Sequence, residues 1–157
     1  MLSVEHDGNR TASDEEVVAI AKLVAELRQG TFTDSDGSAR QLRENDFMIV
    51  APYNAQVRRL RTGLPAGVRV GTVDKFQGQQ APVVFFSMVT SSGEDVPRNL
   101  AFLFSRNRLN VAISRAQCLA YLVCSPRLLE ARCNSIEEME LVNALCRLVE
   151  YGTRKPV

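Results

Sequence analysis

Short runs of consecutive apolar residues, alternating with helical patterns, constrain the fold of this chain more than any other feature of its sequence. Four runs stand out, and they predict strands over 47–51, 68–73, 83–88 and 119–123. A strand that is apolar at nearly every position is typical of a parallel sheet, which is covered on both faces. Because helical patterns separate these runs, the sequence predicts an α/β domain in three layers, with helices on both sides of the sheet.

Apolar residues at helical spacing predict the helices. The first helix opens with Ser13 and Glu16, which are three residues apart and predict a capping box. Residues 1–12 before it are polar and are expected to be extended or irregular, and 31–45 after it is a polar connection rich in Asp, Ser and Gly. The helices are expected over 14–29, 55–64, 106–116, 126–132 and 136–151.

Length and charge limit the domain count and the kinds of partner. The 157 residues fit one domain with a sizeable core. The net charge is +1, so any contact with nucleic acid must come from a local basic patch, and binding by this domain alone should be weak and sensitive to salt. Most basic residues are arginines, which suit bidentate binding of phosphate, although genome composition alone produces the same bias. No apolar run approaches 18 residues, so we expect no signal peptide, no membrane span and a cytoplasmic location.

The cysteines and the single histidine give no pattern for a metal site. The four cysteines form no C-x-x-C pair and have no flanking histidine, so they read as buried thiols rather than zinc ligands. His6 is expected to be a loop residue near the terminus. The sequence therefore predicts no metal site in this chain.

The loop after the second predicted strand is dense in residues that can bind a phosphate or a sugar. Its two glycines permit close approach of the backbone to a ligand, or a positive φ. Its side chains that can hydrogen-bond such groups are Thr72, Lys75, Gln77 and Gln80. A solvated surface loop explains the same composition, and this segment alone does not separate the two interpretations.

Two arginines are expected on one face of the fourth predicted helix. Arg108, Ala112 and Arg115 have the spacing i, i+4, i+7, which places both guanidinium groups beside the stripe that packs on the sheet. That arrangement suits a polyphosphate. A solvated arginine face is the alternative. Ligands of open parallel sheets bind at the carboxyl ends of the strands, so we expect the polar clusters to meet there.

Three segments resemble motifs of one helicase superfamily. Residues 107–116 resemble motif VI, 71–78 resemble motif V, and 49–56 resemble motif IV. Their order and spacing are similar to the second RecA-like domain of superfamily 1 helicases. The branch is the one that includes the nonsense-mediated-decay RNA helicase and related DNA helicase–nucleases, and the resemblance covers roughly residues 1–135.

The resemblance implies half of an ATPase. In the family, ATP lies between two RecA-like domains, and the first domain carries the Walker A and B motifs. This sequence contains no G-x-x-x-x-G-K-[ST] segment, so it has no phosphate-cradling loop of its own. The resemblance therefore implies a single RecA-like domain with a P-loop NTPase fold over 1–157, in which 1–12 is a linker from a first motor domain. ATP and Mg²⁺ would serve the complete enzyme, and this chain alone would bind neither tightly.

The resemblance also assigns roles to individual residues. Arg115 matches the motif VI arginine finger, which neutralises charge on the γ-phosphate in the transition state, with Arg108 as the second catalytic arginine. Residues implied to contact the nucleotide are Gln77, Gly78, Gln80 and Glu16. Residues implied to contact a single nucleic-acid strand are Tyr53, Asn54 and Thr72.

Two of these assignments have qualifications. The family usually has glutamate where this chain has Gln80, and an amide offers a ribose hydroxyl only one acceptor oxygen, which weakens the expected sugar contact. For Glu16, helix capping explains the residue equally well.

The leading hypothesis is the C-terminal motor domain of an ATP-dependent helicase, inactive alone. Its partners would be the first RecA-like domain and single-stranded nucleic acid, with DNA favoured over RNA. The alternative is a nucleic-acid- or protein-binding module that kept the fold and lost the motor. Intact Arg108 and Arg115 favour the first hypothesis, and Gln80 favours the second. A self-contained phosphate-binding protein is disfavoured because the P-loop is missing.

Overall fold

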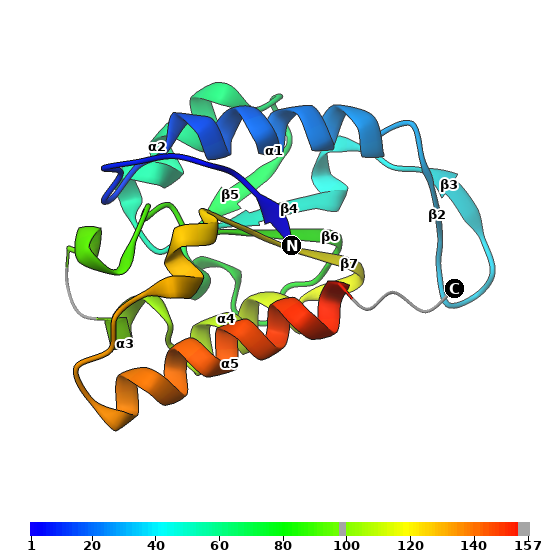
Figure 1. Ribbon diagram of the computed structural model, residues 1–157. Coiled ribbons are helices and arrows are strands. Elements are labelled where there is room, and N and C mark those ends of the chain that lie inside the picture. Colours follow the sequence, from blue (N-terminus) through cyan, green and yellow to red (C-terminus); the bar gives the residue numbers. More distant parts are fainter. Residues whose placement is uncertain (98–99, 154–157) are drawn as a thin grey trace.

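A parallel sheet runs through the middle of the molecule, as the apolar runs predict (Figure 1). The computed structural model describes residues 1–97 and 100–153. Within them the sheet has five strands in the order β1-β7-β6-β4-β5, and every neighbouring pair is parallel. Its strands are β1 (Leu2–Ser3), β4 (Phe47–Val50), β5 (Arg69–Gly71), β6 (Ala81–Ser87) and β7 (Ala116–Cys124). The predicted α/β class and parallel arrangement are confirmed.

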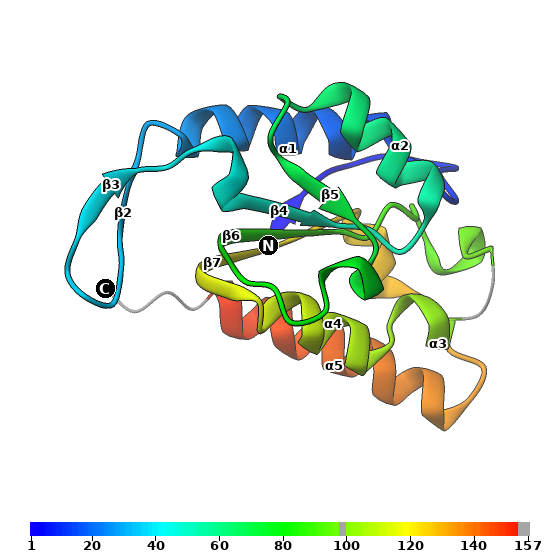
Figure 2. The ribbon, with the colours of Figure 1, turned by 180° about the vertical axis from the view of Figure 1, so that it is seen from behind.

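Helices cover both faces of this sheet (Figures 1 and 2). One face carries α1 (Asp14–Leu27) and α2 (Asn54–Gly63). The other carries α3 (Leu100–Leu103), α4 (Arg106–Ile113) and α5 (Ile136–Thr153). Short 3-10 turns complete the connections: η1 (Glu44–Asp46), η2 (Val73–Phe76), η3 (Gly93–Asp95) and η4 (Pro126–Glu130).

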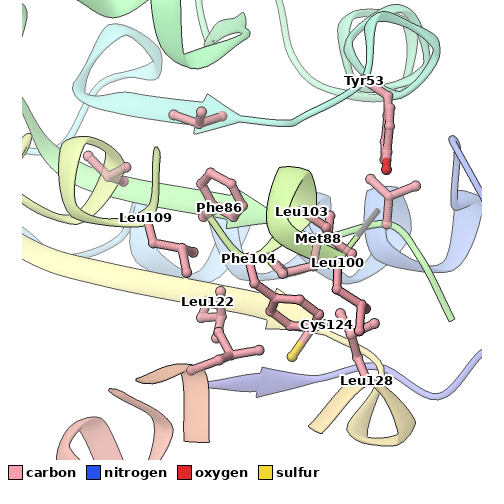
Figure 3. Close-up of a cluster of buried hydrophobic side chains, with 14 of the residues drawn as sticks. Tyr53, Phe86, Met88, Leu100, Leu103, Phe104, Leu109, Leu122, Cys124 and Leu128 are labelled. Atoms are coloured by element: carbon pink, nitrogen blue, oxygen red, sulfur yellow. The ribbon is translucent and has the colours of Figure 1, made fainter. Parts of the chain in front are cut away.

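Each face of the sheet has its own apolar core, because successive side chains of a strand point to opposite sides. Phe47 and Ile49 of β4 pack towards α1 and α2, whereas Met48 and Val50 pack towards α3, α4 and α5. Figure 3 shows the second cluster, in which Phe86 of β6 lies among side chains from the helices below it. Burial on both faces is the physical reason that these strands read as continuous apolar runs.

The boundary between α4 and β7 differs from the prediction. The helix ends at Ile113 instead of 116, and the strand begins at Ala116 instead of 119. Ala116 pairs with Ala81 of β6, so the strand starts three residues before the predicted position. The predicted burial of 119–123 is also wrong for its first half, since Leu119 is 39% exposed and only the end of β7 is buried.

Two segments form strands that the sequence did not indicate. Leu2 and Ser3 pair in parallel with Val123 and Cys124, so part of the polar segment 1–12 belongs to the sheet. Within 31–45 the chain forms an antiparallel hairpin of β2 (Thr31–Thr33) and β3 (Ala39–Gln41), which extends away from the main sheet (Figure 1). Asp34 closes its turn by accepting hydrogen bonds from the backbone N–H groups of residues 36 and 38.

The described part of the chain contains no helix that is both long enough and apolar enough to cross a membrane. The four cysteines are free thiols, of which Cys118 is exposed and Cys124 is buried. Burial raises the pKa of the Cys124 thiol to about 12, so this group is unreactive at neutral pH.

Candidate functional site

The residues singled out in the sequence lie at two opposite edges of the sheet. Because all its strands are parallel, their amino ends meet at one edge and their carboxyl ends at the other. Gln80 and Arg115 directly precede β6 and β7, so they lie at the amino edge. Asn54 and Thr72 follow β4 and β5, so they lie at the carboxyl edge. The expectation that all the polar clusters meet at the carboxyl edge is therefore wrong, because η2 and the turn after it return the chain to the amino end of β6.

Backbone hydrogen bonds fix Gln80 beside Arg115 at the amino edge. The backbone N–H of Ala81 donates to the carbonyl of Arg115 at 3.0 Å, and Ala81 is the register partner of Ala116. The carbonyl of Gln80 accepts a hydrogen bond from Arg69 Nη2 at 2.9 Å, while its side chain stays exposed. Gln80 closely follows the motif V-like segment, and Arg115 belongs to the motif VI-like segment. Backbone hydrogen bonds therefore hold the two segments next to each other without using either side chain.

The turn that leads into Gln80 is open to solvent. Gln77 and Gly78 are both exposed, and Gly78 has a φ of +77°, a conformation that favours glycine. A Cβ atom at Gly78 would meet nothing within 4 Å, so the glycine is needed for its backbone conformation and leaves free space above the turn. A ligand can approach this backbone closely.

Arg115 does not lie on helix α4, contrary to the prediction. It lies in the turn Ser114–Arg115 between α4 and β7, so the expected pair of arginines on one helical face does not form. Its side chain is half-buried, and its Nε–H is buried without a hydrogen-bond partner among the described residues. No carboxylate in that part of the chain lies within ion-pair distance of it. A buried donor without an acceptor is unfavourable, so this position suits an acceptor supplied from outside the domain.

Arg108 belongs to the other end of α4. Its guanidinium carbon lies 4.0 Å from the centre of the Phe102 ring, a cation–π contact. The Phe102 ring in turn lies 5.7 Å from the ring of Tyr53, centre to centre. Tyr53 is the third residue after β4, so Arg108 lies on the side of the residues that are predicted to contact nucleic acid, and not beside Arg115.

The three residues assigned to nucleic acid differ in accessibility. Asn54 is exposed as the first residue of α2, and Thr72 is half-buried immediately before η2. Tyr53 is only 8% exposed and packs in the core shown in Figure 3. Asn54 and Thr72 therefore remain available to a strand, while little of Tyr53 can be reached.

Glu16 is fully buried, and its carboxylate is used by the protein itself. One oxygen accepts from the backbone N–H of Val89 at 3.0 Å and lies 3.2 Å from His6 Nε2, and the other accepts from the Ser87 hydroxyl at 2.5 Å. The predicted capping box forms only in part, because Ser13 Oγ accepts from the Glu16 N–H while the carboxylate points into the core. This enclosed carboxylate holds the backbone and side chains around it in place, and its contact with a nucleotide stays a prediction.

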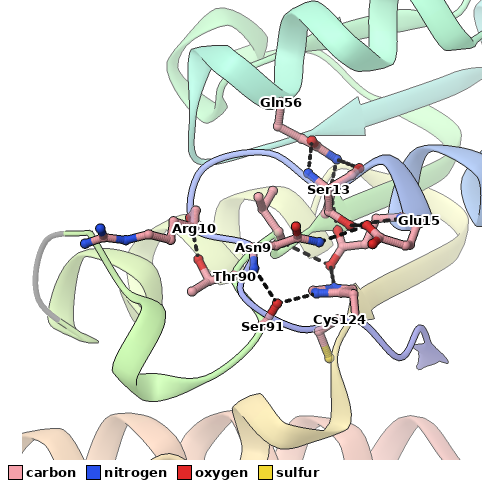
Figure 4. Close-up of polar contacts among 12 residues, drawn as sticks. Asn9, Arg10, Ser13, Glu15, Gln56, Thr90, Ser91 and Cys124 are labelled. Carbon is pink, nitrogen blue, oxygen red and sulfur yellow. Dashed lines mark hydrogen bonds and ion pairs between the residues drawn. The ribbon is translucent and has the colours of Figure 1, made fainter.

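A buried polar network surrounds this carboxylate at the carboxyl end of β6 (Figure 4). His6 Nδ1 lies 2.7 Å from Ser91 Oγ, so this histidine is buried, although it lies in the loop between β1 and α1 as expected. Gln56 joins α2 to the cap of α1: its Oε1 accepts from the Ser13 N–H at 2.8 Å and its Nε2 donates to the Ser13 carbonyl at 3.1 Å. Neither side chain belongs to a periodic pattern, so sequence reasoning gave them no role here.

The network also holds a strained turn. Val89, the second residue after β6, has a φ of +73°, which is rare for a β-branched residue. The backbone N–H of Thr90 donates to the Met88 carbonyl at 2.8 Å across it, which makes a tight three-residue turn. Such strain persists only where the surroundings fix it, and the bond from Val89 to Glu16 supplies that constraint.

The residues of this chain fit half of a nucleotide site. The exposed turn 77–80 and the unpartnered Nε–H of Arg115 offer hydrogen-bond donors and open space at one edge. The described residues contain no group of three His, Cys, Asp or Glu side chains that could hold a metal ion. Ligands for a metal that accompanies a nucleotide would therefore come from elsewhere in a complete site.

Comparisons with known proteins give one consistent family. The model of the AAA domain family matches residues 3–127. The chain is similar to putative helicase mov-10-B.1 of Danio rerio, at 32% identity over 125 residues that cover 70% of this chain. It is also similar to the DNA polymerase alpha-associated DNA helicase A of Schizosaccharomyces pombe, at 44% identity over 77 residues, or 47% of this chain. RNA helicase Mov10l1 of Homo sapiens matches at 34% identity over 57% of this chain.

These relatives are much longer proteins, since the aligned segments make up 12%, 11% and 8% of their respective lengths. The family match covers most of the chain, including the segments that contain Asn54, Thr72, Gln80 and Arg115. Together with the parallel sheet and the order of the motifs, it shows that the chain belongs to this AAA domain family, as a C-terminal RecA-like domain of superfamily 1 helicases.

Proposed function

We propose that this chain is the C-terminal motor domain of an ATP-dependent DNA or RNA helicase, supplying the arginine finger and part of the nucleic-acid track. The observation that carries the proposal is the backbone pairing that fixes Gln80 beside Arg115. A first RecA-like domain would contribute the P-loop, and this chain alone would be inactive. Helicase relatives of both DNA and RNA type are consistent with the general function and do not select the nucleic acid.

Arg115 acts on the nucleotide in this proposal. ATP, with Mg²⁺, supplies the reactive γ-phosphate in the cleft between the two domains. The Arg115 guanidinium neutralises the charge that develops there, and its planar group of donors suits phosphate oxygens. Support comes from its buried Nε–H, which has no acceptor among the described residues. The exposed amide of Gln80 and the open backbone at Gly78 then face the nucleotide from the same edge.

The carboxyl edge binds the single strand in this proposal. Asn54 and Thr72 contact the sugar-phosphate backbone and do not read bases, because a motor that moves along a strand needs contacts independent of sequence. Support comes from their accessibility at the ends of neighbouring strands β4 and β5. DNA is favoured over RNA in this assignment, and the site is expected to act in the cytoplasm.

A second candidate is a binding module without motor activity. Gln80, where the family usually has glutamate, and the enclosed carboxylate of Glu16 favour it, since both weaken the case for nucleotide contact. The two candidates differ in whether Arg115 affects the rate of ATP hydrolysis.

The deciding experiment replaces Arg115 in the complete protein that contains a P-loop domain. An arginine finger contributes roughly 10³- to 10⁵-fold to the rate, so Arg115→Ala should lower kcat for ATP by at least about a thousandfold. Because the effect belongs to the transition state, the Kd for ATP should change much less. Arg115→Lys should not restore the rate, because lysine lacks the planar fork of donors.

Arg127→Ala is the matched control. Arg127 is 55% exposed, pairs with Asp7 and lies in η4 beyond the carboxyl end of β7, opposite the proposed nucleotide edge. Its replacement should leave kcat unchanged. Melting temperature and single-turnover hydrolysis are measured on the same preparations. An Arg115→Ala protein that is destabilised but fully active would contradict the finger assignment.

A further inference from the structure

A pocket of about 380 Å³ lies at the outer edge of the sheet, beside β5. β5 is the last strand in the sheet order, so among the described residues it has a neighbouring strand on one side alone, and Figure 2 shows it beside α2. The pocket is lined by the loop from α2 to β5, by β5 itself, and by part of the segment 75–79. Its volume falls within the range of small-molecule sites, roughly 300 to 1,000 Å³. We call it the edge pocket.

Three cationic side chains line the edge pocket: Arg61 near the end of α2, Arg69 in β5, and Lys75 in η2. Arg61 Nη2 and Lys75 Nζ each donate to the Val70 carbonyl at 3.3 Å, so these two nitrogens are separated by at most twice that distance. None of the three side chains forms an ion pair with a carboxylate in the described part of the chain. One neutral carbonyl oxygen does not compensate two positive charges, and each side chain keeps further N–H donors.

Arg69 is the most enclosed of the three cations. Its Nη2 donates to the Gln80 carbonyl at 2.9 Å, while its Nε–H is buried and has no hydrogen-bond partner among the described residues. Burial lowers the pKa of this guanidinium below its ordinary value. The carboxylate of Asp46 acts on Arg69 electrostatically, but both of its oxygens accept hydrogen bonds from Arg40. Arg69 therefore lacks an anionic partner of its own.

Much of the remaining lining of the edge pocket is apolar. The loop between α2 and β5 contributes Leu64, Pro65, Ala66 and Val68, of which Pro65 and Ala66 are exposed. A ligand that is anionic at one end and apolar at the other would use both parts of this lining. A phosphate of a nucleic-acid backbone would use the cations alone, so the lining favours a small organic molecule over a nucleic-acid strand.

We propose that the edge pocket binds a small organic phosphate, with the phosphate group on the three cations and the carbon portion on the apolar lining. The two arginines suit phosphate because their planar groups of donors match its oxygens, and Lys75 adds a compact positive charge. The site is separate from the proposed nucleotide edge, since Arg115 is not among its lining residues. Such binding requires neither ATP nor a second motor domain.

Protection of the sheet edge is the alternative role for these cations. Charged side chains on an outer strand discourage pairing with another chain. That role accounts for Arg61 and Lys75 at the Val70 carbonyl, but it does not require a pocket or the enclosed position of Arg69. The two roles differ in one measurable property, because protection of the edge predicts no affinity for a phosphate.

The test titrates the 157-residue chain with phenyl phosphate and, separately, with inorganic phosphate. The two probes share the charged group and differ in the apolar ring. Low ionic strength is used because salt screens exposed charges. The backbone amide signals in NMR spectra report both the Kd of each probe and the residues that it affects.

We expect phenyl phosphate to shift the amide signals of 64–70 and to bind with a Kd at least about threefold lower than that of inorganic phosphate, because its ring covers apolar surface. Arg61→Gln and Lys75→Gln should each weaken binding at least about fivefold, through loss of a charge-assisted hydrogen bond. Both side chains are exposed, so neither change removes core packing. Arg58→Gln is the matched control, since Arg58 is exposed on the same helix outside the pocket lining and its loss should leave the Kd unchanged.

Three results would overturn the proposal. They are equal affinity for the two phosphates, unchanged binding in both Arg61→Gln and Lys75→Gln, and displacement of phenyl phosphate by a thymidine-only oligonucleotide, which would assign the pocket to nucleic acid. Arg115→Ala should leave both Kd values unchanged, and its effect on ATP hydrolysis is measured separately. Failure of the edge pocket as a phosphate site and failure of the Arg115 assignment are therefore distinguished.

Discussion

Thr72 is the residue on which the nucleic-acid assignment depends most directly. It is half-buried at the carboxyl end of β5, and η2 starts directly after it. Thr72→Ala in the complete helicase should weaken single-strand binding about fivefold, the effect of losing one hydrogen bond, and equally for strands of different sequence. Fluorescence anisotropy with several oligonucleotides measures this. Thr62→Ala is the control, since Thr62 is exposed on α2 and bonds only its own helix; unchanged affinity in Thr72→Ala would remove the residue from the track.

At the residue scale, the sequence identified the candidate residues, but it did not reveal their burial or the groups that contact them. Arg115 was found through its motif, yet its place in a turn follows from the Ala81–Ala116 pairing, a contact that helical spacing cannot reveal. The burial of Glu16 and His6 escaped prediction for a similar reason. Their partners Ser87, Val89 and Ser91 lie more than 70 residues away in the sequence, so no local pattern links them.

At the scale of single elements, the Arg40–Asp46 ion pair is one of the contacts that attach the β2–β3 hairpin to the domain. Arg40 of β3 donates to both carboxylate oxygens of Asp46, at 2.6 and 2.7 Å, and the backbone N–H of Arg43 donates to the same carboxylate at 2.7 Å. The Arg40 guanidinium holds the pKa of the Asp46 carboxyl below its ordinary value of 3.8. Only 7% of the Asp46 side chain is exposed, so water does not replace these bonds easily.

This pair predicts a stability change that depends on pH. A carboxyl with a lowered pKa in the folded state contributes its full stabilisation above pH 3.8 and loses it as the pH falls through the lower folded value. Asp46→Asn should therefore lower the free energy of unfolding by about 1 to 2 kcal/mol at pH 7. The difference from the unmodified chain should shrink below about pH 4. Urea titrations from pH 7 to pH 2.5 measure it, with exposed Asp36→Asn as control; a difference independent of pH would exclude the ionised pair as its cause.

The elements that were predicted correctly are those whose apolar or periodic pattern extends over many consecutive residues. The apolar strands β4 and β6 and the periodic helices α1 and α2 were found close to their observed positions. By contrast, β1 has two residues and exists only because β7 lies beside it, and the hairpin strands have three residues each. Elements this short derive their stability from tertiary contacts, which a single sequence does not display.

At the scale of the whole molecule, the candidate residues lie at two opposite edges of one sheet, and the sequence contains no P-loop. The isolated 157-residue chain should therefore hydrolyse no ATP, with or without single-stranded nucleic acid. Sensitive phosphate-release assays on the purified chain measure this. The control is the same chain carrying Arg115→Ala. Turnover that is stimulated by a single strand and disappears in the control would show that this chain is a complete ATPase.

The length of helix α4 and the residues at its two ends determine how the helix transmits movement. It has eight residues, about 12 Å, and contains neither proline nor glycine, so it has no hinge. Near one end Arg108 contacts Phe102, whose ring lies against Tyr53, and the other end leads through Ser114 to Arg115. A stiff rod held at both ends transmits displacement without absorbing it. Under the proposed function, movement of a strand past the carboxyl edge would therefore displace Arg115 relative to the nucleotide, and we expect α4 to couple stepping to hydrolysis.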